Sequence, residues 1–394
     1  MDNNVVIAAL GRRLRLGVVG GGGAGSVGPV HRTAARLDDR YEIVASVLSS
    51  DPQRSREQGL AIGIPNDRAY ETFDEMIDKE SGRPDPVDVL AIMTPNDDHY
   101  AQCCAGMEHG FDIICDKPMT TTFADALDLV RRVRQTGLVF CLTHCYAAYP
   151  MVRQARAMVR AGELGEIRMV EVEYVEGELA EPIAPDPTGR LPWRQIPEKA
   201  GPSIVLGDIG THAHNLACYV ADLQVTGLCA DVATMMPGRK VDDYAAMLLR
   251  FSNRARGVMW VTQVATGAEE FLSVRVVGET GMLEWHQDRP NELTHRPLHG
   301  SARLLTRGGS DLAAESLRVT RSYRGNPEGF HEAFANLYAD VAEAIVARRA
   351  GTSADPLALD FPTVEDGARG MKMIEAALES TRNGGVWVDC SVSF

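Results

Sequence analysis

Residues 14–37 read LRLGVVGGGGAGSVGPVHRTAARL, which predicts a strand, a glycine-rich turn and a helix. A unit of this kind leaves unpaired backbone N–H groups and the positive end of the helix facing one point, where a pyrophosphate can bind. The stretch therefore predicts a dinucleotide-binding turn.

Two glycine registers satisfy the G-x-G-x-x-G spacing of such turns. One begins at Gly20 and ends at Gly25, and the other begins at Gly23 and ends at Gly28. We expect a single long turn that contains both registers. The residues of this turn expected to contact the cofactor are Gly20, Gly22, Gly23, Gly25 and Ser26.

Length and charge limit the possible functions. A chain of 394 residues is long enough for two domains at roughly 100 to 200 residues each. The net charge of −14 argues against nucleic-acid and anionic-membrane partners, which need clustered cations. The chain also has no signal-peptide pattern and no run of about 18 apolar residues, so we expect a cytoplasmic protein without a membrane partner.

Short apolar runs alternate with helical patterns from residue 14 to residue 143, which is typical of βαβ units in a parallel sheet. Five or six strands can be placed, including 41–48, 87–93, 111–115 and 138–143. Their nearly continuous apolar character is typical of strands covered on both faces. We expect residues 1–145 to form a dinucleotide-binding domain.

The pattern changes after residue 143. A strand over 169–174 is followed by a proline-rich stretch, 177–202, that indicates a functional loop, and then by a helix over 207–221. Five further β-like runs lie between residues 227 and 285, separated by tight turns typical of an antiparallel sheet. We expect residues 146–394 to form an α+β domain with an open, mainly antiparallel sheet, whose final helix can pack back on the first domain.

Polar residues follow several predicted strands of the first domain. In open parallel sheets the ligand lies at the carboxyl ends of the strands, so these residues are candidates for cofactor contacts. They are Ser49, Ser50 and Arg54 after the strand at 41–48, Thr94, Pro95, Asn96 and His99 after the strand at 87–93, and Asp116 and Lys117 after the strand at 111–115.

Lys117 is the first catalytic candidate. It lies between an aspartate and a proline at the end of a predicted buried strand. In a nucleotide crevice its ammonium can hydrogen-bond the oxygen of an alcohol or ketone and stabilise alkoxide character. The alternative is a solvated turn lysine.

Asp208 and His212 form the second candidate group. Four residues apart on a helix, they share one face, whereas His214 points elsewhere. A carboxylate beside an imidazole raises its basicity, as a base removing a hydroxyl proton requires. The alternative is a helix N-cap with a structural histidine. We expect no metal site, because His212 and His214 diverge and no cysteine or histidine cluster is nearby.

Taken together, the glycine turn, Thr94-Pro95-Asn96 with His99, Asp116-Lys117-Pro118 and Gly207-Asp208-Ile209-Gly210-Thr211-His212 resemble the Gfo/Idh/MocA oxidoreductases, the glucose-fructose oxidoreductase and inositol dehydrogenase family. The resemblance covers nearly the whole chain. It implies an N-terminal Rossmann domain, a nicotinamide cofactor bound between the domains, and a homodimer or homotetramer formed through sheet faces.

The resemblance also implies residue roles. Lys117, Asp208 and His212 correspond to the family's catalytic lysine, aspartate and histidine, with His212 as the acid/base. The same three residues, with Tyr146, Trp193 and Arg194, correspond to the substrate side. Asp116 departs from the usual glutamate, which puts its contact with the cofactor ribose in doubt.

The choice of cofactor stays open between NAD and NADP. Ser49 and Ser50 stand where an NAD enzyme often has an acid, and Arg54 is near, but Asp51 can supply the carboxylate. We therefore favour NAD over NADP.

The sequence thus predicts an NAD(P)-dependent oxidoreductase acting on a secondary alcohol or ketone of a sugar, glycoside or cyclitol. Two alternatives remain. One is an NAD-dependent glycosidase of the same family that oxidises the sugar transiently and eliminates the aglycone. The other is a non-catalytic dinucleotide sensor, which has no need of Lys117 and His212.

Overall fold

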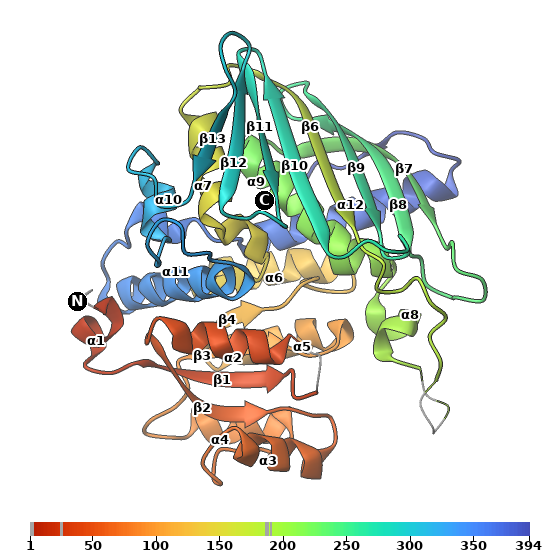
Figure 1. Cartoon of the computed structure of the whole chain (residues 1–394). Helices are drawn as coiled ribbons and strands as arrows, with labels where there is room; N and C mark the ends of the chain where they lie inside the picture. Colours follow the sequence, from red (N-terminus) through yellow and green to blue (C-terminus); the bar gives the residue numbers. More distant parts are fainter. Residues whose placement is uncertain (1–3, 24–26, 186–188, 190) are drawn as a thin grey trace. The chain divides into compact units, whose positions relative to one another are not determined.

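The computed structural model describes residues 4–23, 27–185, 189 and 191–394. The chain divides into two compact units (Figure 1). Unit 1 comprises Met1–Thr120, Ala124–Cys145 and Phe330–Val364, and unit 2 comprises Thr121–Phe123, Tyr146–Gly329 and Glu365–Phe394. The penultimate helix of the chain therefore belongs to unit 1, and all but the first residue of the last helix belongs to unit 2.

Unit 1 is built on a parallel sheet of five strands in the order β2-β1-β3-β4-β5. Strand β3 is apolar and buried along its whole length, and β4 is buried throughout and apolar after Asp112, as expected for strands covered on both faces. Where a further strand was possible, the described residues hold only an isolated bridge between Ser46 and Ala69. The strands are β1 (Leu14–Gly20), β2 (Tyr41–Val47), β3 (Val89–Met93), β4 (Asp112–Cys115) and β5 (Phe140–Leu142).

The helices of unit 1 include one from late in the sequence. Helix α11 packs on α2, and Tyr338 of α11 accepts a hydrogen bond from Tyr41 and lies 2.8 Å from His31. The elements are α1 (Val5–Leu10), α2 (Gly28–Leu37), α3 (Pro52–Ala61), α4 (Phe73–Ser81), α5 (Asn96–Glu108), α6 (Phe123–Thr136), α11 (Phe330–Ala350) and η4 (Pro356–Leu359), with Phe123 itself in unit 2.

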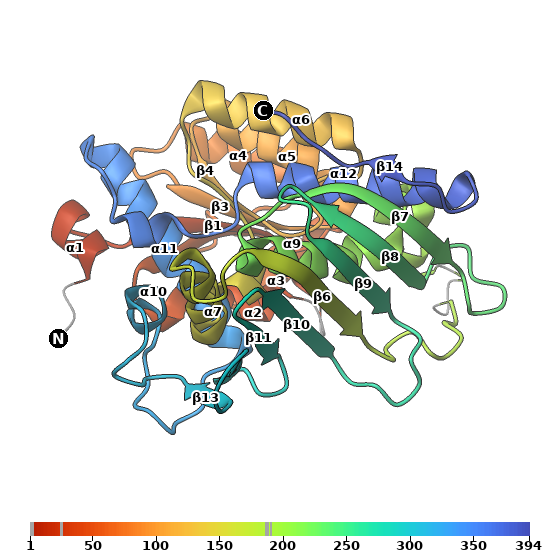
Figure 2. The same cartoon turned by 90° about the horizontal axis from the view of Figure 1, so that it is seen from above.

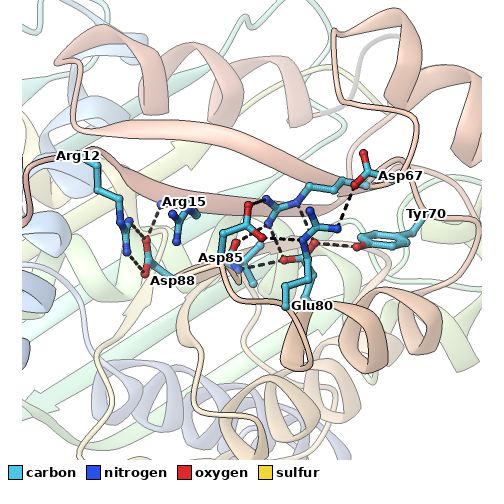
Figure 3. A network of polar contacts seen from close by, with 10 residues as sticks. Arg12, Arg15, Asp67, Tyr70, Glu80, Asp85 and Asp88 are labelled. Atoms are coloured by element: carbon cyan, nitrogen blue, oxygen red, sulfur yellow. Dashed lines mark hydrogen bonds and ion pairs between the residues drawn. The ribbon is translucent and has the colours of Figure 1, made fainter.

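Buried ion pairs stabilise the amino-terminal edge of this sheet (Figure 3). Glu80 of α4 is fully buried and accepts two hydrogen bonds from Arg68 and one from Tyr70. Asp88, just before β3, pairs with Arg12 and with Arg349 of α11. Burial opposes ionisation of Asp88, but these partners hold its pKa below the usual range. These ion pairs lie at the end of the sheet where its strands begin, opposite the carboxyl ends of the strands.

Unit 2 is built on a nine-stranded sheet in the order β13-β12-β11-β10-β6-β9-β8-β7-β14. Neighbouring strands are antiparallel except for β6 and β9, which are parallel. The strands are β6 (Ile167–Val175), β7 (Val225–Ala233), β8 (Tyr244–Phe251), β9 (Arg256–Thr262), β10 (Phe271–Gly278), β11 (Gly281–His286), β12 (Glu292–Pro297), β13 (Arg303–Thr306) and β14 (Val388–Asp389).

Helices cover one face of this sheet (Figure 2). Helix α9 packs on β6, β9 and β10. The hydroxyls of Ser380 and Thr381 on α12 accept hydrogen bonds from backbone N–H groups of β7, and Thr381 also donates one to the Ala230 carbonyl oxygen. The strands alternate buried and exposed residues, so the other face is open. The helical elements are η1 (Cys145–Ala148), α7 (Pro150–Arg160), η2 (Trp193–Gln195), α8 (Pro197–Ala200), η3 (Leu206–Gly210), α9 (Thr211–Ala221), α10 (Ala314–Arg318) and α12 (Val364–Arg382).

The two sheets confirm the predicted fold class, an α/β chain with a Rossmann-like parallel sheet and a mainly antiparallel second sheet. The sequence analysis missed β12, which is mostly polar, and β13, which is only four residues long. It also left the 177–202 stretch without regular structure, whereas η2 and α8 lie within its described part. In the ranges that the structure describes, none of the helices has the length and apolarity needed to cross a membrane.

Candidate functional site

The glycine-rich turn after β1 is wedged between the ends of β2 and β3. Gly20 and Gly21 have φ angles of 83° and 69°, which favour glycine. A Cβ at Gly20 would lie 2.6 Å from the Met93 carbonyl oxygen, and one at Gly22 would lie 2.4 Å from that of Leu48. These positions therefore admit only glycine without a shift of the backbone.

Gly28 at the start of α2 is the close-packing glycine of the turn. A Cβ there would lie 1.9 Å from the Gly21 carbonyl oxygen. A Cβ at Gly23, in contrast, would have no atom of the described residues within 4 Å, its chain neighbours aside. Thus the protein itself demands glycine at position 28 but not at position 23. Gly25 and Ser26, the other two predicted contacts in this turn, lie outside the described residues.

The end of β2 is organised by a helix cap. The Asp51 carboxylate accepts a hydrogen bond from the Arg54 backbone N–H and caps α3, while Ser49 Oγ accepts one from the Asp51 N–H. Ser50 and the side chain of Arg54 are exposed. The predicted residues therefore form a polar and accessible loop at this corner of the sheet.

His99 connects the two loops that follow β3 and β4. Its Nδ1 lies 2.9 Å from the Pro118 carbonyl oxygen, and its Nε2 lies 2.9 Å from that of Thr94. The ring is 1% exposed. Pro95 and Asn96 begin α5, with Asn96 also buried, and the Thr94 hydroxyl donates to Gln102. His99 thus links the loop after β3 to the loop after β4.

Asp116 and Lys117 follow β4 directly. The Asp116 carboxylate accepts hydrogen bonds from the Thr143 hydroxyl, at 2.7 Å, and from the backbone N–H of Lys117, at 3.0 Å. Burial opposes ionisation of Asp116, but His31, Lys117 and Thr143 hold its pKa below the usual range. The hydrogen bond to Asp116 fixes the backbone of Lys117, and the residue as a whole is half-buried.

These loops fit a dinucleotide. The turn offers backbone at the carboxyl ends of β1, β2 and β3, at positions where side chains are excluded. It leads into the amino terminus of α2, whose unpaired N–H groups and dipole favour phosphate. The residues present therefore suit the cofactor that the sequence predicts.

In unit 2, Asp208 lies in a π-helical segment, η3, that continues directly into α9 with His212. The sequence predicted a regular helix from residue 207, so the first turn is a correction. Two glycines, Gly207 and Gly210, lower the helix propensity of this turn, and Gly210 packs closely on Leu206. Asp242 accepts the backbone N–H of Val205 and thereby fixes the start of the segment.

Gln263 and Arg194 are partners of Asp208 within unit 2. Gln263 Nε2 donates to its Oδ2 at 3.0 Å, and Arg194 Nε lies 3.6 Å from the same oxygen. The guanidinium of Arg194 also lies 4.7 Å from the Trp193 ring centroid. The structure thus brings Arg194, from the proline-rich loop, to the predicted catalytic aspartate.

His212 lies beside a pair of tyrosines. The Tyr146 and Tyr174 hydroxyls are 2.8 Å apart, and the Tyr146 ring contacts the His212 ring edge-on with centroids 4.9 Å apart. His212 itself is buried. The two hydroxyls therefore accompany the imidazole at the same corner of unit 2.

His214 faces a different part of unit 2. Its Nε2 lies 3.7 Å from Cys218 Sγ, and burial lowers its pKa to about 4. It is therefore a neutral core histidine. Within the described ranges, no group of three or more histidine, cysteine, aspartate or glutamate residues could hold a metal ion.

Sequence reasoning missed three residues of this corner: Tyr174, Glu176 and Gln263. Gln263 Nε2 donates to Glu176 Oε1 at 2.9 Å as well as to Asp208. Glu176 and Gln263 follow the ends of β6 and β9, which the parallel pairing of these strands places together. The sequence holds no motif for these residues. The structure shows that Glu176 is buried, whereas the charged residues within β6 are exposed or partly exposed.

Two family models match the chain. One, described as an oxidoreductase family with an NAD-binding Rossmann fold, matches residues 14–144, and the GFO/IDH/MocA C-terminal domain matches residues 152–284.

Individual relatives support the same family relationship. The Bacillus subtilis oxidoreductase YfiI is 30% identical over 383 residues, which covers 96% of this chain and 98% of YfiI. The solved structure of an inositol dehydrogenase homolog from Azotobacter vinelandii, complexed with NADH and myo-inositol, has a TM-score of 0.88 and 33% identity, covering 96% of this chain and 98% of that one. Levoglucosan dehydrogenase from Pseudarthrobacter phenanthrenivorans is 26% identical over 312 residues, 72% of this chain and 76% of that enzyme.

Proposed function

Because this chain belongs to the Gfo/Idh/MocA family of NAD-binding oxidoreductases, we propose that it transfers a hydride between NAD and a secondary alcohol or ketone of a sugar, glycoside or cyclitol. The observation that carries this proposal is the corner of unit 2 where Asp208 and His212 lie with Arg194 and a tyrosine pair. Such a set of polar groups suits a polyhydroxylated substrate. It also agrees with the myo-inositol and levoglucosan named for the relatives.

The cofactor would be held by unit 1. The turn at Gly20–Gly23 and the amino terminus of α2 would bind its pyrophosphate, and the loop of Ser49 to Arg54 would bind the adenosine ribose. The Asp116 carboxylate, fixed by Thr143, would accept a hydrogen bond from a ribose hydroxyl of the cofactor. Bound NAD supplies the capacity to accept or return a hydride.

The proposed catalytic residues each handle one charge or proton. His212 removes the hydroxyl proton of the substrate during oxidation and returns it during reduction. Asp208 orients His212 and stabilises its imidazolium form. Lys117 donates a hydrogen bond to the substrate oxygen as negative charge develops there.

A screen for ligands and turnover tests this function. Thermal shift with NAD and with NADP identifies the cofactor, and sugars, glycosides and inositols are then added to the saturated protein. Stoichiometric growth of reduced-nicotinamide absorbance with a polyol supports a dehydrogenase. Release of an aglycone without that growth would replace it with the redox-neutral glycosidase, and NAD binding without any turnover would favour a sensor.

We further propose a homodimer or homotetramer formed through the open face of the unit 2 sheet. Leu248 of β8 is paired with Val258 of β9, and Trp260 lies two residues further along β9 on the same face. All three are exposed, at 51%, 46% and 38% respectively. Adjacent apolar side chains on an exposed sheet face are typical of a protein interface.

A further inference from the structure

A second buried carboxyl group lies next to Asp208. Glu176 and Gln263 are both almost completely buried, and one nitrogen of the Gln263 amide donates to both acids. The nitrogen carries two hydrogens, so it can serve Glu176 and Asp208 at the same time. The Gln263 amide is therefore a bridge between the two carboxyl groups.

The charges around this bridge place the proton on Glu176. Asp208, Glu178 and Glu270 all act on Glu176 with negative charge, while the guanidinium of Arg194 lies beside Asp208, with its Nε 3.6 Å from Oδ2. Burial raises the pKa of Glu176 to about 7. Asp208 is the more exposed of the two acids and has the guanidinium, so it holds the negative charge more readily.

The Gln263 amide oxygen gives an independent indication. It is buried, and among the described residues no donor reaches it. A buried acceptor without a donor is costly. A protonated carboxyl group and a primary amide can pair through two parallel hydrogen bonds, in which the amide N–H donates to the acid C=O and the acid O–H donates to the amide C=O. Protonated Glu176 would thus supply the missing donor.

We propose that Glu176 is a positioning residue that keeps a proton, pairs with Gln263 as an acid with an amide, and so holds the second amide hydrogen on Asp208. The pairing itself depends only on unit 2, whereas its effect on turnover rests on the proposed function of Asp208. Loss of the Glu176 proton removes one of the two hydrogen bonds, allows the amide to turn, and leaves Asp208 less firmly oriented. Turnover then declines as pH rises through this ionisation.

The variant Glu176→Gln tests the pairing without any need for turnover. Glutamine can form the same two hydrogen bonds but cannot titrate. An acid with a raised pKa in the folded state contributes stability at low pH that is lost as pH rises from its unfolded value to its folded value. The melting temperature of Glu176→Gln, relative to wild type, should therefore increase by about 3 °C between about pH 5 and pH 8.

The exposed residue Glu181 lies nearby in the chain and is not among the charges that act on Glu176, so it supplies the matched control. The difference between Glu181→Gln and wild type should stay flat over the same pH range. A flat difference for Glu176→Gln as well would overturn the proposal. If that variant does not fold, wild type is titrated by infrared difference spectroscopy: a protonated-carboxyl C=O band that titrates near neutral pH and shifts in Gln263→Leu supports the pairing, and its absence overturns it.

Kinetics then test the effect on Asp208, with NAD and myo-inositol or whichever polyol the screen identifies. Wild-type kcat should fall as pH rises above about 7, and Glu176→Gln should abolish this fall while keeping kcat within about threefold at lower pH. Gln263→Leu should lower kcat about tenfold with little change in KM for NAD. Unaltered pH dependence in Glu176→Gln would refute the positioning role. A rising melting-temperature difference in a protein that turns over no polyol would instead refute the proposed function and leave the pairing intact.

Discussion

Lys117 and His212 are fixed by different means, and this difference bears on how substitutions will act. The backbone of Lys117 is held by the Asp116 carboxylate, which accepts its N–H. His212 is held through its ring, which contacts Tyr146 edge-on inside unit 2. Truncating the lysine side chain therefore leaves its loop in place, whereas truncating His212 opens a small gap beside the tyrosines.

We expect Lys117→Ala and His212→Ala each to lower kcat by about 10²- to 10⁴-fold, because each removes a group that acts on the developing charge or the proton. The affinity for NAD should change by less than about threefold, since neither side chain belongs to the glycine turn. Initial rates of reduced-nicotinamide formation give kcat, and calorimetric titration gives the NAD affinity.

His214→Gln is the matched control for these variants. It lies on the same helix as His212 but faces Cys218, so kcat should stay close to that of wild type once the melting temperature shows a folded protein. Unchanged turnover in both Lys117→Ala and His212→Ala would reject the assignment of these residues.

For single residues, the sequence indicates candidates whose local pattern is unusual, but not residues that act through a hydrogen bond to a residue far away in the chain. Lys117, Asp208 and His212 are conspicuous because polar side chains follow apolar runs at these points. Glu176 and Gln263 lie 87 positions apart and belong to no motif. Only the parallel pairing of β6 with β9 brings them together, and strand order is a tertiary property that local pattern does not specify.

Among the elements, the glycine turn contains one glycine that the fold requires, Gly28, and one that the fold does not require, Gly23. Gly28→Ala should destabilise the cofactor-free protein by about 1 to 3 kcal/mol, because its Cβ would overlap the Gly21 carbonyl oxygen. Gly23→Ala should leave that stability nearly unchanged, because in the part of the chain that the structure describes its Cβ would meet no atom beyond its chain neighbours. Denaturant unfolding without cofactor measures both effects.

Binding then gives the opposite discrimination. If the backbone at Gly23 faces the pyrophosphate, Gly23→Ala should weaken NAD binding at least tenfold although the fold is intact. A Gly23→Ala variant that is stable and also binds NAD normally would place the pyrophosphate elsewhere in the turn. The pair of variants thus reports on packing and on binding separately.

Other elements show why periodicity predicts some structure and not the rest. Apolar runs at 244–251 and 271–277 and helical patterns at 329–349 and 363–381 predict the strands β8 and β10 and the helices α11 and α12 to within a residue or two. The strand β12 carries Glu292, Thr294 and His295, so it has little apolar signal and forms through pairing with β11. The π-helical turn at Asp208 contains Gly207 and Gly210, two residues of low helix propensity, and its wider turn is not part of a regular helical template.

On the scale of the whole molecule, the open sheet face combines apolar and charged contacts. Arg275 on this face pairs with Glu171 and Glu284, beside the Val258 and Leu248 pair. A net charge of −14 would keep separate copies apart, so association needs a surface where apolar burial outweighs repulsion. Arg275 offsets part of the negative charge of Glu171 and Glu284 at that place.

We expect Leu248→Glu and Trp260→Glu each to convert a homo-oligomer into single chains, because a carboxylate buried in the interface would lack a partner. Light scattering during size-exclusion chromatography measures the mass. Met235→Glu, at a residue that is 61% exposed but lies outside this sheet face, should leave the mass unchanged. Since NAD binds to unit 1, the dissociated variants should still show the thermal shift with NAD. A wild-type protein that is already a single chain, or an assembly that survives both substitutions, would show that this face is not the interface.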